Sequence, residues 1–124
     1  MITGIGTDLI EMARVEQVGL DRLSARILSK EEKEFLPTDT KRKREFVSGR
    51  FAAKEAVAKA MGTGIGKTLG FRDISVVPDS LGRPIVHLSQ VAVLSLKGNR
   101  EVRIHLSITH TREYAAAFAV LEEC

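Results

Sequence analysis

The feature that most constrains the fold is a long helical pattern that ends in a glycine-rich loop, between Gly49 and Gly66. We expect the helix to begin near Asp39 or Thr40 and to run to Met61. Gly62 would then end it, because glycine readily adopts the left-handed conformation found at helix C-termini. This long helix is the element against which the rest of the expected fold packs.

Two cations lie inside the apolar stripe of this helix. At about 100° per residue, the stripe contains Val47, Phe51, Ala58 and Met61. Arg50 and Lys54 fall within the stripe, and Glu55 lies at its edge. Because a buried cation needs an anion, the pattern favours a phosphorylated ligand bound at this helix.

Asp8 stands near the end of an expected strand, residues 2–10, on the face that also holds two glycines. Small residues there leave room for a ligand or for another backbone. Asp8 either caps the following helix or binds a hard metal such as Mg²⁺, which takes one or two carboxylates. The metal interpretation needs a second carboxylate, and Glu55 is the best candidate. Lys59 follows Glu55 by one turn, so a plain surface ion pair is the alternative for those two residues.

Helical signals come early in the chain and hairpin-linked strands come late, which predicts an α+β fold with an antiparallel sheet packed against the long helix and shorter helices. The shorter helices are expected at 11–17, at 21–28, from Ser29 to Pro37 after a Ser29-Lys30-Glu31-Glu32 capping box, and at 89–97, before Gly98-Asn99. Further strands are expected at 71–77, 85–88, 101–108 and 114–121. The 124 residues are expected to form a single domain, 1–124.

Composition and charge restrict the classes of partner that the chain is expected to bind. The net charge of +3 favours an anionic partner, and the basic run Lys41-Arg42-Lys43-Arg44 leaves a small nucleic-acid-binding module as an alternative. Aromatic residues make up only 5% and Trp is absent, so stacking platforms for nucleic acid are few. A lone Cys124 predicts a cytoplasmic protein, and no run approaches the roughly 18 apolar residues that a membrane span needs.

The loop Gly62-Thr63-Gly64-Ile65-Gly66-Lys67-Thr68 resembles a nucleotide-binding P-loop only superficially. Its spacing is one residue short, and it follows a helix where a P-loop follows a strand. A nucleotide hydrolase is therefore disfavoured, which leaves either a backbone that approaches a phosphate or a helix stop followed by a turn. His105 and His110 flank a strand, and His110 is expected just past its end.

Several motifs, taken in order, resemble holo-acyl-carrier-protein synthases, the small trimeric class of 4′-phosphopantetheinyl transferases. They are Ile5-Gly6-Thr7-Asp8-Leu9-Ile10-Glu11, Arg50-Phe51-Ala52-Ala53-Lys54-Glu55-Ala56, Lys59-Ala60-Met61-Gly62-Thr63-Gly64-Ile65-Gly66, Asp79-Ser80-Leu81-Gly82-Arg83-Pro84, His105-Leu106-Ser107-Ile108-Thr109-His110 and Tyr114-Ala115. The resemblance implies the 4′-phosphopantetheinyl transferase fold. It also implies transfer of the phosphopantetheine arm of coenzyme A to a serine of apo acyl carrier protein, with release of adenosine 3′,5′-bisphosphate, in support of fatty acid biosynthesis.

The same resemblance implies a role for individual residues. Asp8 and Glu55 would bind Mg²⁺ and, with Lys59, form the catalytic group. Arg14 would meet the acidic carrier protein, and the basic run would lie near the 3′-phosphate. Coenzyme A would contact Arg50, Gly62, Pro84 and His110.

The resemblance further implies a homotrimer with its sites at subunit interfaces and no nucleic-acid or membrane partner. Ile10 stands where larger relatives carry an acidic residue, which implies that water completes the metal shell. The residues leave the general base open between Asp8 and Glu55, and they give Lys54 no task.

Overall fold

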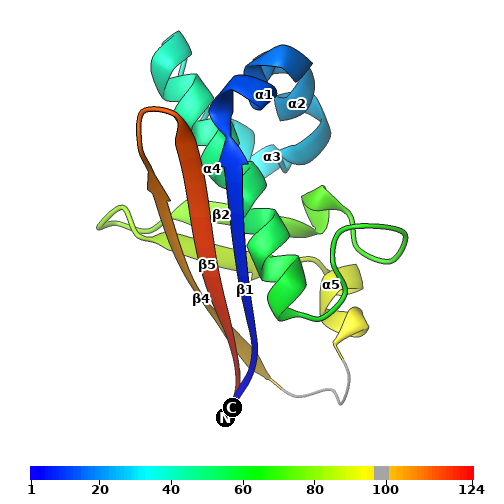
Figure 1. Ribbon diagram of the computed structural model, residues 1–124. Coiled ribbons are helices and arrows are strands. Elements are labelled where there is room, and N and C mark those ends of the chain that lie inside the picture. The colour runs from blue at the N-terminus through cyan, green and yellow to red at the C-terminus, as the bar shows by residue number, and fades with distance from the viewer. Residues whose placement is uncertain (97–100) are drawn as a thin grey trace.

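A three-stranded antiparallel sheet and one long helix organise the fold of this computed structural model, which describes residues 1–96 and 101–124 (Figure 1). The sheet has the order β1-β5-β4, so the C-terminal strand is central, the N-terminal strand pairs with it at one edge, and both chain ends lie together. Its strands are β1 (Ile2–Glu11), β4 (Val102–His110) and β5 (Tyr114–Glu123). Helix α4 (Thr40–Ala60) crosses one face of the sheet.

Small residues allow α4 to lie close to the sheet. Ala115, Ala117 and Ala119 occupy alternate positions on the face of β5 toward α4 and are buried. Buried alanines of α4 belong to the same apolar cluster as Ala117 and Ala119. The approach is tightest at β1, where a Cβ on Gly4 would lie 1.9 Å from the carbonyl oxygen of Ala60. The glycines of this strand therefore make room for another backbone, which is one of the two expected reasons for them.

Helix α4 begins and ends where the sequence predicted. Asp39 is its N-cap, and its carboxylate accepts a hydrogen bond from the amide of Arg42 at 3.0 Å. Gly62 follows the C-cap Met61 with φ of +81°, the left-handed conformation that suits glycine. The predicted bounds are correct to within one residue at each end.

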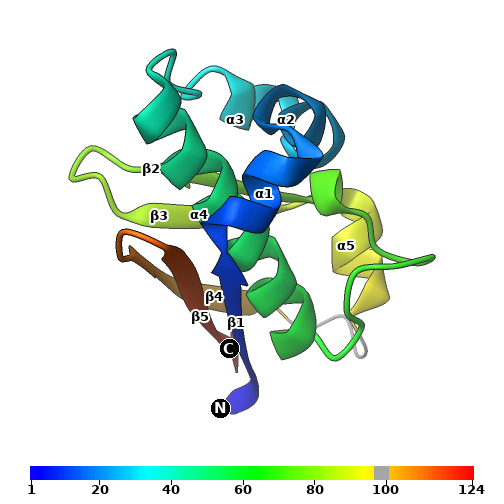
Figure 2. The same ribbon diagram turned by 45° about the horizontal axis from the view of Figure 1, so that its top comes forward.

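Three short helices gather around the N-terminal half of α4 (Figure 2). They are α1 (Met12–Val18), α2 (Leu20–Ile27) and α3 (Lys30–Lys33). The predicted capping box is confirmed, since Ser29 and Glu32 bond each other's backbone amides. Helix α3 nevertheless stops before Pro37, because residues that precede proline disfavour the helical conformation and the amides of Phe35 and Leu36 bond back only three residues.

A separate hairpin lies beside β4, formed by β2 (Ile74–Pro78) and β3 (Pro84–Leu88). The expectation of a strand from Phe71 is wrong, because residues Phe71–Asp73 form a 3₁₀ turn in which the Asp73 carboxylate accepts from the amide of Gly70 at 2.8 Å. Helix α5 (Gln90–Ser95) lies within the predicted range, and the hydroxyl of Ser89 caps it by accepting from the amide of Ala92. The predicted break at Gly98-Asn99 lies outside the described residues.

The buried side chains form two apolar clusters that share α4. One fills the space between α4, the large sheet and the hairpin, and the other lies under α1 and α2. In the second cluster the rings of Phe51 and Phe71 stack with centroids 5.4 Å apart. No helix among the described residues is long and apolar enough to cross a bilayer.

Candidate functional site

Asp8 and Glu55 come together where β1 passes α4. Lys59 donates to the backbone carbonyl of Thr7 at 3.0 Å and to Oδ1 of Asp8 at 3.3 Å. Asp8 does not cap the next helix, because Glu11 occupies the N-cap position of α1. The lysine thus contacts Asp8 across the strand–helix junction, rather than serving only as a neighbour of Glu55 along the helix.

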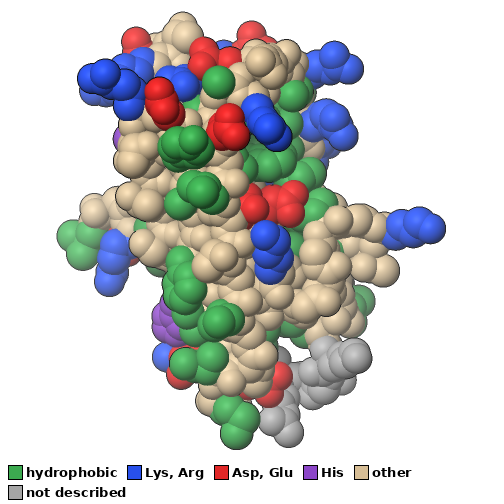
Figure 3. Space-filling model, viewed as in Figure 1, with side chains coloured by type: hydrophobic (Ala, Val, Ile, Leu, Met, Phe, Trp, Pro, Cys, Tyr) green, Lys and Arg blue, Asp and Glu red, His purple; other side chains and the backbone are tan. Residues whose placement is uncertain are grey.

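The electrostatics of this junction favour a cation. Burial raises the pKa of Glu55, and the negative charge of Asp8 raises it further, while Lys59 acts in the opposite direction. Oδ2 of Asp8 is buried and has no hydrogen-bond partner among residues 1–96 and 101–124. Figure 3 shows acidic side chains gathered beside a basic one in the middle of this face, over β1 and α4. Two carboxylates, one with an unpartnered oxygen, form a donor set that fits Mg²⁺.

A second group of predicted residues lines a cleft of about 340 Å³ on another side of α4. Arg50 of α4, Pro84 of β3 and His110 of β4 border it together with other residues from the same elements. His110 is the last residue of β4 rather than a loop residue, which corrects the expectation. Its Nδ1 lies 3.3 Å from Oε2 of Glu45. Cationic groups in a cleft of this kind suit an anionic ligand.

The two cations in the apolar stripe have different partners. Lys54 is fully buried and pairs with Glu32 of α3 at 2.6 Å, so the chain itself supplies the anion that we expected from a phosphorylated ligand. The guanidinium of Arg50 lies 4.3 Å from the ring centre of Phe46, and its Nε donates to the carbonyl of Val76 at 3.1 Å. Helical spacing could have indicated Phe46, which precedes Arg50 by four residues on the same helix, but no spacing indicates Glu32, which lies on a different helix.

The glycine-rich loop lies apart from that cleft. The amides of Thr63 and Gly64 both donate to the carbonyl of Ala58, and Gly66 donates to Leu69. The two bonds to Ala58 satisfy a carbonyl at the C-terminus of α4, where the helix dipole is negative, and the bond to Leu69 closes the turn that follows. A helix stop followed by a turn therefore accounts for this geometry, and contact of Gly62 with coenzyme A stays a prediction.

The basic run is divided between structural and accessible cations. Lys43 pairs with Asp21, and Nε of Arg44 lies 2.7 Å from Oε1 of Glu16, so both tie α4 to the helices before it. Arg42 instead borders the cleft that contains Arg50. One of the four cations is thus placed to meet the ligand of that cleft.

Arg14 borders a separate groove of about 360 Å³ at the end of β1. The groove is lined mainly by apolar side chains from β1, α1, α2 and α4. The Arg14 side chain is exposed, and its Nε lies 3.9 Å from Oε1 of Glu11. A cation at the rim of an apolar groove suits a protein partner with acidic and apolar side chains.

Within one chain, the predicted site residues form two groups. Arg50 and Glu55 are five positions apart, which places them about 140° apart around α4. Asp8 lies on β1 and His110 on β4, the opposite edges of the sheet. The structure therefore brings Asp8, Glu55 and Lys59 together, and separately Arg50, Pro84 and His110.

Comparisons with known proteins agree on one family. The model of the 4′-phosphopantetheinyl transferase superfamily matches residues 4–119. The holo-[acyl-carrier-protein] synthase of Geobacillus sp. (strain WCH70) is 46% identical over 98% of each chain. A crystal structure of the Bacillus anthracis holo-(acyl-carrier-protein) synthase in complex with CoA (3′,5′-ADP) is 46% identical, with a TM-score of 0.86 over 100% of this chain and 99% of that one. The Helicobacter pylori holo-[acyl-carrier-protein] synthase in complex with coenzyme A is 31% identical, with a TM-score of 0.81 over 95% and 99% of the two chains.

Proposed function

The chain belongs to the 4′-phosphopantetheinyl transferase superfamily, and we propose that its site residues act as follows. The enzyme transfers the 4′-phosphopantetheine arm of coenzyme A to a serine of apo acyl carrier protein and releases adenosine 3′,5′-bisphosphate. The observation that carries the assignment of the site is the Asp8–Glu55 pair, with its unpartnered buried oxygen. Such a pair is costly without a cation.

Asp8 and Glu55 hold Mg²⁺ in this proposal. When bound, the metal supplies positive charge to the pyrophosphate oxygens on which negative charge develops. Lys59 already lies at hydrogen-bond distance from Asp8, with half of its side chain exposed, and so can also face the phosphates. The serine oxygen attacks the phosphorus that carries the pantetheine arm, the bond to the adenosine bisphosphate breaks, and a carboxylate of the pair accepts the serine proton.

The cleft at Arg50 binds the nucleotide end of coenzyme A. Arg50 and His110 contact its phosphates, and Pro84 lies against the nucleotide. Arg42 is the member of the basic run placed to meet the 3′-phosphate. Arginine suits this task because its planar fork matches two phosphate oxygens at once.

A homotrimer would join the two groups of site residues. The carboxylates lie at the β1 edge of the sheet and the cations at the β4 edge, so a head-to-tail ring brings one chain's carboxylates beside its neighbour's cations. The sheet face away from α4 carries exposed apolar side chains that such a ring would cover (Figure 3). They include Ile5 and Phe118.

Mixed assemblies test this arrangement. Glu55→Gln and Arg50→Ala should each inactivate the enzyme alone. Co-expressed in equal amounts, they should restore about a quarter of the sites in a ring whose sites each use two chains. A mixture that stays inactive, although native mass spectrometry shows trimers that contain both variants, would place each site within one chain.

The carrier protein docks at α1, where Arg14 stands beside the apolar groove. The test of the whole function mixes the enzyme with apo acyl carrier protein, coenzyme A and Mg²⁺ and weighs the carrier intact. The carrier should gain the mass of one phosphopantetheine, and a chelator should prevent the gain. A carrier of unchanged mass with metal present would refute the transferase activity, whereas transfer that survives the chelator would refute only the metal.

A further inference from the structure

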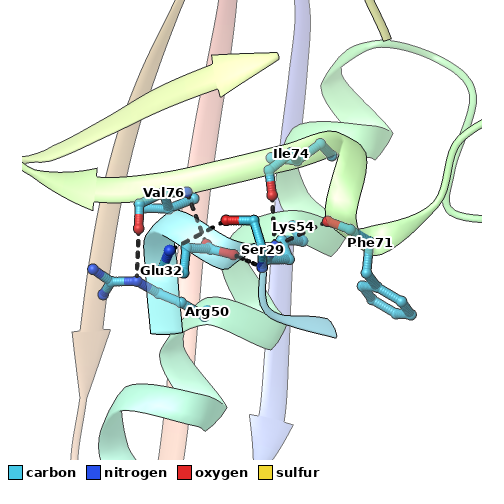
Figure 4. Close-up of polar contacts among 7 residues, drawn as sticks. All are labelled: Ser29, Glu32, Arg50, Lys54, Phe71, Ile74 and Val76. Atoms are coloured by element: carbon cyan, nitrogen blue, oxygen red, sulfur yellow. Dashed lines mark hydrogen bonds and ion pairs between the residues drawn. The ribbon is translucent and has the colours of Figure 1, made fainter. Parts of the chain in front are cut away.

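The edge of β2 that faces away from β3 is free of strand pairing and is instead covered by charged side chains. On that edge the carbonyl of Ile74 accepts from Lys54 at 2.5 Å. The amide of Val76 donates to Oε2 of Glu32 at 2.8 Å, and the carbonyl of Val76 accepts from Nε of Arg50 at 3.1 Å. Figure 4 shows these three side chains converging on β2 from α3 and α4. Buried backbone groups need such partners.

The ion pair between Glu32 and Lys54 is internally complete. The ammonium of Lys54 has three donors, and they meet Oε1 of Glu32 and the carbonyls of Phe71 and Ile74. Both carboxylate oxygens of Glu32 also accept from backbone amides, those of Ser29 and Val76. Because both side chains are fully buried and satisfied, the pair has no donor left for a ligand.

Arg50 differs, because its bond to Val76 uses only Nε. Within residues 1–96 and 101–124 the structure shows no hydrogen bond from its two terminal nitrogens. The ring of Phe46 supports the guanidinium from one side, and Arg50 borders the cleft beside Pro84 and His110. In Figure 4 the terminal nitrogens point away from Lys54. The bond to the Val76 carbonyl therefore fixes the direction in which the two terminal nitrogens of Arg50 point.

We propose that Glu32 and Lys54 are positioning residues for Arg50: their buried ion pair fixes the free edge of β2, and the Val76 carbonyl on that edge aims the Arg50 guanidinium at the phosphates of coenzyme A. This inference rests on the proposed binding of coenzyme A at that cleft. It gives Lys54 a task that involves no contact with substrate.

A double-mutant cycle on binding separates positioning from plain stability. The perturbing change is Glu32→Gln with Lys54→Met, which removes both charges together and so leaves no unpaired buried ion. The matched control is Glu34→Gln with Lys33→Met, the same chemical changes at exposed residues at the C-terminal end of α3. Calorimetry then measures the Kd for coenzyme A of the buried double variant and of the exposed double variant. Each is measured both with Arg50 retained and with Arg50→Ala added.

With Arg50 present, the buried double change should weaken coenzyme A binding about tenfold, while the exposed control changes Kd less than twofold. In the Arg50→Ala background the buried change should have almost no further effect. Equal weakening in both backgrounds would overturn the proposal.

If the buried variant does not fold, Arg50→Lys still tests the idea. It keeps the charge but has no Nε for Val76, so it should bind as weakly as Arg50→Ala; binding equal to the parent would overturn the proposal. Absence of coenzyme A binding by the parent enzyme would instead refute the proposed function.

Discussion

Replacing Gly6 by alanine tests whether the close approach of β1 to α4 sets the geometry of the Asp8–Glu55 pair. The added Cβ would lie 2.0 Å from the carbonyl oxygen of Ala56 and 2.8 Å from the amide nitrogen of Ala60. Both are backbone atoms, so no side chain can move aside, and strand and helix must separate by about 1 Å to reach ordinary contact. Overpacking of this kind costs about 1–3 kcal/mol, and we expect the upper end.

The displacement should also reach the site, because Asp8 lies two residues along the same face of β1. A 1 Å misplacement of catalytic groups lowers rates by about 100-fold, so the transfer rate should fall by that order even in the folded fraction. In thermal unfolding at fixed protein concentration, about 3 kcal/mol corresponds to a fall in Tm of roughly 12 °C for a chain of this size.

Gly66→Ala is the matched control. Apart from its chain neighbours, no atom of residues 1–96 and 101–124 lies within 4 Å of the Cβ it would add, so its free energy of unfolding should stay within about 0.5 kcal/mol of the parent. The reasoning is refuted if Gly6→Ala unfolds at the temperature of the parent and retains full activity, because β1 and α4 would then be packed loosely enough to accept the added methyl group.

Three further predictions concern charge. Glu55→Gln should abolish transfer yet leave the metal-free protein at least as stable at neutral pH, which thermal unfolding in a chelator measures. Burial and Asp8 raise the pKa of Glu55 in the folded state. The contribution of Glu55 to the free energy of unfolding is therefore full below its unfolded pKa and is lost as pH rises through its folded pKa. Between about pH 4 and pH 7, Glu55→Gln should accordingly lose less stability than the parent, which thermal unfolding at each pH measures. Arg14→Glu should raise KM for the carrier protein about tenfold with KM for coenzyme A unchanged, and added salt should narrow the gap between variant and parent; equal KM values for the carrier would remove Arg14 from the docking surface.

The sequence predicted the α+β class, the order of the elements and the long helix because these depend on local periodicity and capping. The capping box at Ser29 and the stop at Gly62 are signals of that kind. The 3₁₀ turn at Phe71–Asp73 was missed because the carboxylate of Asp73 bonds the backbone amide of Gly70 and the hydroxyl of Ser89, which favours a turn over an extended strand.

The site was predictable in its members but not in their grouping. Asp8 and Glu55 meet because two glycines on β1 let α4 approach, and that pattern is visible in the sequence. The division of Asp8 from His110 depends on strand order, since β5 lies between β1 and β4. Strand order is a property of the whole sheet, and no motif in the chain encodes it.

A cation inside an apolar helical stripe signals a buried anion but does not say whether the chain or a ligand supplies it. Lys54 and Arg50 give the same signal in the sequence, yet the acceptors around them differ. Lys54 has three donors and three protein acceptors, so its environment is closed. Arg50 has five donors and one described protein acceptor, the carbonyl of Val76. The unmatched donors of Arg50 at the rim of a cleft therefore point to a ligand, whereas the fully matched donors of Lys54 point to a structural role.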